Sequence, residues 1–118
     1  MTAVARHRFW SAVSGADIPL ACHFGGGLLL PHPNGVVIHP TVRIGINCLI
    51  FQQVTLGHAG SGVPTVGDHV DFGAGAKVLG AITIGDGAVI GANAVVLMDV
   101  PPGATAVGVP AKILGAVR

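Results

Sequence analysis

An uninterrupted repeat of six residues runs from Val66 to Pro101. Its first position always holds a large apolar residue, and its fifth position holds a mostly small one. The first-position residues are Val66, Phe72, Val78, Ile84, Ile90 and Val96, and the fifth-position residues are Val70, Ala76, Ile82, Ala88, Ala94 and Val100. An α-helix repeats its apolar face about every 3.6 residues and a strand about every two, so neither has this period.

The six-residue period predicts a parallel β-helix. In such a solenoid the coils stack about 4.8 Å apart, so that first-position side chains fill the axis and fifth-position side chains fit the crowded corners. Glycine often fills the second position, at Gly67, Gly73, Gly85 and Gly91. We expect a tight turn there, because a turn leaves little room for a side chain.

The register extends towards the N-terminus in two earlier blocks with two breaks. The blocks begin at Ile18 and Ile38, and the register is lost between Leu30 and Ile38 and again between Leu56 and Val66. A solenoid accepts insertions as excursions from its corners, and such loops often carry binding residues. The two breaks are therefore the places where function is expected.

The apolar character of the chain does not come from a membrane-spanning segment. Mean hydropathy is +0.74, and 51% of the 118 residues are apolar while 9% are charged. Gly, Asp, Asn or Pro interrupts every few positions, so no run approaches the roughly 18 apolar residues of a spanning helix. We expect no membrane partner. A thin solenoid would instead bury an outer face against copies of itself, which predicts an oligomer.

Charge and cysteine content exclude further classes. A formal charge of +1 with few Lys and Arg does not suit nucleic acid as a partner. Cys22 and Cys48 fall on fifth positions, which predicts small core thiols rather than a disulfide or a metal pair. The first sixteen residues contain no apolar stretch of signal-peptide length, so a cytoplasmic location is expected. Phe9, Trp10 and Val13 predict one face of a short helical cap in this segment.

Two of the six histidines lie in the breaks, and these are the candidates for chemistry. His32 and His58 would stand on corner loops, where a neutral imidazole can act as a general base near neutral pH. The other four fall in regular or capping segments, where a surface or structural role is the prediction. They are His7, His23, His39 and His69.

Four segments resemble the catalytic domain of serine acetyltransferases, which are left-handed β-helix hexapeptide-repeat acyltransferases. They read DIPLACHFGGGLLLPHPNGVVI, QQVTLGHAG, GAGAKVLG and DVPPGATAVGVPAKIL, and the resemblance covers residues 17–115. It implies an all-β, left-handed parallel β-helix, which the short N-terminal helical cap predicted from the residues themselves would precede. The implied divisions are a cap over 1–16, a catalytic domain over 17–104, and a C-terminal tail over 105–118 that contains GVPAK. The left hand comes from the resemblance alone.

The same resemblance implies an acetyl-CoA-dependent O-acetyltransferase of cysteine biosynthesis. His32 corresponds to the catalytic base and Asp17 to the carboxylate that orients it. The residues implied to contact acetyl-CoA are Gly57, His58, Gly73, Ala74, Lys77 and Lys112. A homotrimer with active sites between subunits is implied as well. No metal is expected, because the close-spaced histidine pair of the zinc-binding relatives is absent.

The sequence departs from the family pattern at the positions that bind the acceptor. Pro31 replaces an acidic residue before His32, and the loop GSGVP lacks an Arg-His pair. The acceptor can therefore be serine, a related small alcohol, or a sugar or natural-product hydroxyl. His58 follows a TLG turn that is similar to the catalytic turn of galactoside-type acetyltransferases, so it is a second candidate base or acceptor contact. A non-catalytic trimeric scaffold remains the alternative from another class.

Overall fold

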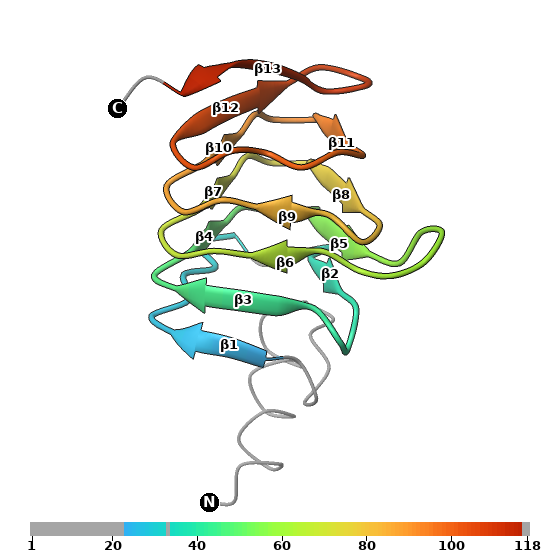
Figure 1. The fold of residues 1–118 in the computed structure, drawn as a ribbon. Helices are drawn as coiled ribbons and strands as arrows, with labels where there is room; N and C mark the ends of the chain where they lie inside the picture. Colours follow the sequence, from blue (N-terminus) through green and yellow to red (C-terminus); the bar gives the residue numbers. More distant parts are fainter. Residues whose placement is uncertain (1–22, 33, 117–118) are drawn as a thin grey trace, which may run out of the picture.

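The computed structural model describes residues 23–32 and 34–116. Along these residues the chain forms thirteen β-strands and no helix. The strands wind into three sheets that enclose a common interior, as Figure 1 shows. The predicted solenoid of stacked parallel strands is thus confirmed. The predicted helical cap lies outside the described residues. No helix able to cross a membrane is found in the described part of the chain.

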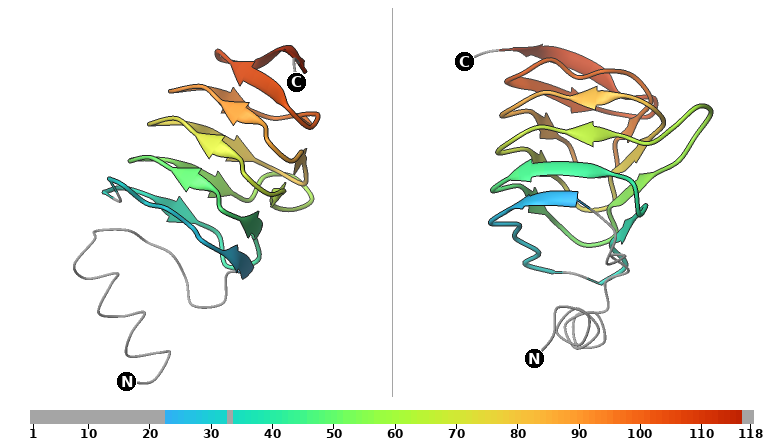
Figure 2. Two further views of the ribbon diagram at one scale, coloured as in Figure 1. Left: turned by 90° about the vertical axis from the view of Figure 1, so that its left-hand side faces the viewer. Right: turned by 60° about the horizontal axis from the view of Figure 1, so that its bottom comes forward.

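Each sheet forms one face of the solenoid and takes one strand from each coil. The β3 face contains β1 (His23–Gly26), β3 (Arg43–Ile46), β6 (Thr65–Val66) and β9 (Thr83–Ile84). The β4 face contains β4 (Leu49–Ile50), β7 (Asp71–Phe72), β10 (Val89–Ile90), β12 (Ala104–Val107) and β13 (Lys112–Ala116). The β5 face contains β2 (Val37–Ile38), β5 (Thr55–Gly57), β8 (Lys77–Leu79) and β11 (Val95–Val96). Figure 2 shows the coils as stacked layers from two further sides.

The strand register reports the length of each coil. Ile38 pairs with Leu56, which is eighteen residues on, so a regular coil is three hexapeptides long. Ile44 pairs with Val66 after twenty-two residues, because four extra residues lie between β5 and β6. Phe24 pairs with Ile44 after twenty residues, which places a two-residue insertion in the coil that contains His32. Both breaks in the repeat are therefore insertions into otherwise regular coils.

The core is the interior of the solenoid, and the repeat predicted it well. All six first-position residues from Val66 onwards are buried, and Phe72 is the largest fully buried side chain. The fifth-position residues are buried too, except Ile82, which is half-buried. Cys48 is a buried free thiol, as predicted, whereas Cys22 lies outside the described residues. Burial raises the pKa of the Cys48 thiol, so it stays protonated and unreactive near neutral pH.

The second-position glycines are needed because the coils stack closely there. The sequence predicted a tight turn as the reason instead. A Cβ added at Gly73 would lie 2.6 Å from the backbone nitrogen of Ala92 in the next coil. A Cβ added at Gly91 would lie 2.9 Å from Cγ1 of Val107. Neither glycine has a left-handed φ. The coils therefore approach so closely at these points that only hydrogen fits.

Two of the three corners share a backbone conformation, and the third carries a longer loop. The β3–β4 corner turns through residues with left-handed φ, which are Gly27, Asn47, His69, Gly87 and Gly103. The β4–β5 corner does the same at Gly35, Gln53, Gly75 and Asn93. The β5–β6 corner carries the longer insertion, a loop closed by two hydrogen bonds between Ala59 and Gly62, at 3.0 and 3.3 Å. This loop projects from the solenoid between β5 and β6 (Figure 1).

A hairpin covers the last coil. β12 pairs parallel with β10 and antiparallel with β13, so the chain reverses direction at the end of the solenoid (Figure 1). An uncovered last coil would expose unpaired backbone groups that can pair with another chain. β13 places Lys112 at its first residue, opposite Val107.

Candidate active site

His32 lies at the β4–β5 corner. An isolated bridge joins Leu29 to Leu49 on the β4 face, and β2 begins at Val37 on the β5 face. His32 is exposed between these points, and its ring stacks on Phe51 of the next coil. The ring centroids are 6.4 Å apart, with an interplanar angle of 27°. The insertion thus presents an imidazole to solvent while an aromatic ring supports one of its faces.

Lys77 brings an ammonium group to the same corner. Its Nζ donates hydrogen bonds to the backbone oxygen of Gln53, at 3.2 Å, and to that of Gly75, at 3.0 Å. These two residues are the left-handed corner residues of adjacent coils. The contacts hold the ammonium close to the backbone and leave one of its three N–H donors for another partner.

Two further groups at this corner have unused hydrogen-bonding capacity. The side-chain oxygen Oε1 of Gln52 is buried and has no hydrogen-bond partner among the described residues. Gly73 donates its N–H to Ile90, and Ala74 accepts from Asn93 through its carbonyl. The N–H of Ala74 has no hydrogen bond within the described ranges. The backbone donor of Ala74 therefore stands at this corner without a partner among the described residues, and a ligand could supply one, whereas protein atoms cover the Gln52 oxygen.

His58 lies at the β5–β6 corner, directly after Gly57 ends β5, and it is exposed. Its ring lies beside that of His39, with centroids 6.0 Å apart and an interplanar angle of 34°. His39 follows β2 directly, and β2 and β5 are neighbours in register. The backbone N–H and the hydroxyl of Thr41 contact Nδ1 of His39 at 3.2 and 3.1 Å.

The structure brings some of the predicted residues together and separates others. His32, Gly73, Ala74 and Lys77 share the β4–β5 corner. Gly57 and His58 lie at the opposite end of the β5 face. The five residue steps from Gln53 to His58 span up to about 16 Å of extended strand, so one chain does not bring His32 and His58 to one small molecule. Lys112 is exposed at the end of the solenoid, and Asp17 lies outside the described residues.

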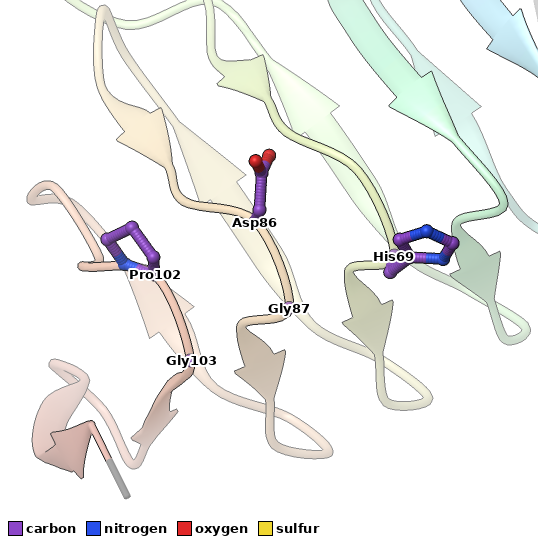
Figure 3. A pocket seen from close by; sticks show the side chains of 5 residues that line it. All are labelled: His69, Asp86, Gly87, Pro102 and Gly103. Carbon is purple, nitrogen blue, oxygen red and sulfur yellow. The ribbon is translucent and has the colours of Figure 1, made fainter. Parts of the chain in front are cut away.

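A groove of about 420 Å³ lies at the remaining corner, between β3 and β4 faces. It is lined by His69, Asp86, Gly87, Pro102 and Gly103, and Figure 3 shows the Asp86 carboxylate between Pro102 and His69. Asp86 accepts a hydrogen bond from the N–H of Asp68 at 2.7 Å, so its carboxylate stabilises the corner. None of the predicted site residues lines this groove.

The described part of the chain contains no candidate metal site. Residues 23–32 and 34–116 contain no group of three or more His, Cys, Asp or Glu side chains that could hold an ion. The pair His39 and His58 provides two nitrogen ligands, fewer than the three protein ligands of a catalytic zinc site.

The sequence does not indicate two residues of these corners as site residues. Phe51 is not among the predicted site residues, and the prediction for His39 is a surface or structural role. The repeat did contain the signal for His39: Ile38 and Leu56 are both first-position residues one coil apart, so the residues that follow them must be neighbours. No comparable signal existed for Phe51, because the insertion beside His32 has no repeat to fix its path.

Known proteins similar to this chain are serine acetyltransferases. The serine acetyltransferase of Mycobacterium tuberculosis is 46% identical over 121 residues, which cover 98% of this chain and 52% of that protein. The structure of soybean serine acetyltransferase complexed with serine superposes with a TM-score of 0.85 at 46% identity, covering 94% of this chain and 47% of that one. The Brucella abortus serine acetyltransferase in complex with coenzyme A gives 0.85 at 39% identity, covering 92% and 45%. No protein-family model matches the chain.

The similarity covers nearly all of this chain but only part of each relative. Across the curated relatives, the matched region spans between 32% and 62% of the relative's length. Over the matched region the solved structures have the same fold as this chain.

Proposed function

We propose that the chain is a serine acetyltransferase-like member of the left-handed β-helix hexapeptide-repeat acyltransferases, and that it transfers the acetyl group of acetyl-CoA to an acceptor hydroxyl. The observation that carries the proposal is the placement of His32. Its exposed ring is stacked on Phe51 at the corner that also presents Lys77 and the free N–H of Ala74. Serine is the first acceptor to test, because a similar structure contains it.

The proposed reaction begins with proton removal. A hydroxyl has too high a pKa to attack a thioester unaided, so neutral His32 takes its proton as the oxygen bonds to the acetyl carbon. The tetrahedral intermediate then collapses, the carbon–sulfur bond breaks, and His32 returns the proton to the departing sulfur. The products are an acetyl ester and CoA with a free thiol. Asp17 is proposed to orient His32 and stabilise the imidazolium.

Acetyl-CoA is proposed to lie along the β4–β5 corner. Its pantetheine arm carries amide groups, and an amide carbonyl of this arm complements the unpartnered N–H of Ala74. The remaining N–H of Lys77 and the ammonium of Lys112 are suited to nucleotide phosphates, for which lysine acts as a point charge. A backbone N–H at Gly57 or His58 is proposed to steady the developing oxyanion.

The experiment that tests this function is release of the CoA thiol, followed with a thiol reagent across a panel of alcohols. Cys48 will not add background in the folded protein, since its thiol is buried and protonated. Acceptor-dependent release supports the enzyme. Failure with every acceptor, together with no CoA binding by calorimetry, would leave the non-catalytic scaffold as the better account.

Replacing Lys112 with alanine is expected to raise the KM for acetyl-CoA more than it lowers kcat. A phosphate contact far from the thioester is made equally in the ground state and the transition state, so its loss weakens binding without slowing chemistry. Steady-state kinetics with acetyl-CoA varied will measure both constants. An effect confined to kcat would refute the phosphate contact.

The chain is also proposed to form a homotrimer with active sites between subunits. Support comes from the separation of His32 and His58 on two corners of one chain, which one small acceptor cannot span. A neighbouring subunit that apposes its β5–β6 corner to the β4–β5 corner would bring the two histidines together. We expect sedimentation at micromolar concentration to show a trimer. A monomer that retains full activity would contradict the shared site.

A further inference from the structure

Phe51 is a large aromatic residue on the outside of the solenoid. It follows β4 directly and stands at the second position of its hexapeptide, which glycine often fills. Its side chain is partly exposed. Among the described residues it belongs neither to the buried core nor to the partly buried apolar side chains that pack against that core. Packing of the interior therefore does not account for an aromatic ring at this position.

The insertion that carries His32 is tied to the next coil at its two ends. The carbonyl of Leu29 accepts a hydrogen bond from the N–H of Ile50, and the carbonyl of Asn34 accepts one from the N–H of Gln53, both at 2.9 Å. The described residues between these ends form no backbone hydrogen bond. Five residue steps of the insertion face three steps of the next coil, so the segment with His32 bulges outwards.

The ring of Phe51 is the contact that orients the His32 side chain. Among the described residues, the imidazole forms no hydrogen bond and no ion pair, whereas its ring stacks on Phe51 with centroids 6.4 Å apart and 27° between the planes. This separation lies within the range of about 4.5 to 7 Å for offset-stacked aromatic pairs. An exposed imidazole on a bulged loop would otherwise exchange among several rotamers. The stacking therefore favours one orientation of the ring.

Stacking suits a general base because it occupies the face of the imidazole and leaves the edge accessible. Both ring nitrogens lie in the plane of the ring. One nitrogen can take the proton of a hydroxyl while the other donates a hydrogen bond to an orienting carboxylate, the role proposed for Asp17. The apolar ring of Phe51 has no donor or acceptor that competes for either nitrogen.

We propose that Phe51 is a positioning residue for His32, an inference that rests on the proposed function. Phe51 holds the imidazole in the orientation in which it can take the proton, and it acts on the reaction through His32 alone. The aromatic face is the property that matters. Leucine at position 51 would keep an apolar side chain without that face, whereas tyrosine would keep the ring.

The test measures kcat and the KM for acetyl-CoA in the wild type, Phe51→Leu and Phe51→Tyr. Phe51→Leu is expected to lower kcat about 3- to 10-fold with the KM unchanged, which is roughly the contribution of an aromatic pair to one ring orientation. Phe51→Tyr should restore most of kcat, because its hydroxyl can reach solvent from this partly exposed position. Added to His32→Ala, Phe51→Leu should cause no further loss, since the residue through which it acts is gone.

Ile46→Ala is the matched control. Ile46 is also a large apolar side chain on the outside of the solenoid, 43% exposed, and it ends β3 at the β3–β4 corner. Its truncation should leave kcat unchanged. The inference would be overturned by an unchanged kcat in Phe51→Leu, a loss that tyrosine does not restore, a further loss in the His32→Ala background, or an equal loss in Ile46→Ala. A raised KM for acetyl-CoA in Phe51→Leu would also overturn it, because Phe51 would then contact the donor.

An NMR readout separates this inference from the proposed function. The ring current of Phe51 shifts the imidazole C–H signals of His32, which are assigned by their loss in His32→Ala. Phe51→Leu is expected to move these signals and to leave those of His69 in place. If the wild type acetylates no acceptor, the proposed function is wrong, and the signals still decide whether Phe51 holds the ring. His32 signals that stay in place in Phe51→Leu would contradict the stacking and overturn the inference.

Discussion

Replacing His32 with alanine is expected to lower kcat by about 10² to 10⁴, with little change in affinity for CoA. This is the usual worth of a positioned general base, which acts on the transition state and contributes little to cofactor binding. Steady-state kinetics give kcat, and calorimetry with CoA gives the affinity. His69→Asn serves as the control, since it removes an exposed histidine from the corner that carries none of the predicted site residues.

Asp17 supplies a second test of the proposed catalytic pair that it forms with His32. If Asp17 acts only by orienting His32, Asp17→Asn should cost less than His32→Ala, and the double variant should be hardly worse than His32→Ala alone. Additive losses would mean that Asp17 has a separate role. His58→Ala should keep most of kcat. A variant ranking in which His58→Ala is inactive and His32→Ala is active would favour His58 as the base and a sugar acceptor.

Replacing Phe72 with alanine is expected to reduce the free energy of unfolding by about 3 to 5 kcal/mol. Phe72 is the largest fully buried side chain, and it lies between Ile50 and Ile90 of the adjacent coils, so its removal leaves a cavity at the centre of the stack. Single domains are stable by only about 5 to 15 kcal/mol, so the loss is a large share of the total.

Urea unfolding at one fixed subunit concentration measures this effect, because association would otherwise change the apparent stability. The matched control is Asp71→Ala, which alters the exposed neighbour of Phe72 on the same strand. It should change stability by no more than about 0.5 kcal/mol. Equal effects of the two substitutions would contradict a core organised around the first-position column.

The fold could be predicted from sequence because the same six-residue period applies to every coil. A first-position residue such as Ile84 must face the axis whenever its neighbours above and below do, so one register fixes the whole core. The corners were less predictable. Gln53 and Asn47 adopt left-handed φ without being glycine, whereas Gly73 is required by the approach of the next coil. Composition alone does not distinguish these two reasons.

The sequence indicates candidate site residues only in part, for a related reason. His32 and His58 stood out because insertions interrupt the repeat around them. His39 lies in regular register, so it was read as structural, although the same register places it beside His58. Phe51 could be placed on the outside of its coil, but its contact with His32 depends on the path of a two-residue insertion, which only the structure provides.

The central claim is transfer of an acetyl group from CoA to a hydroxyl with His32 as base. Its most direct test is mass spectrometry of a reaction that contains carbon-13-labelled acetyl-CoA and L-serine near neutral pH. The account predicts a labelled acetyl ester formed in equal amount to free CoA by the wild type, and formed about 10² to 10⁴ times more slowly by His32→Ala. Release of CoA without any labelled ester, or the same rate of ester formation by His32→Ala, would contradict it.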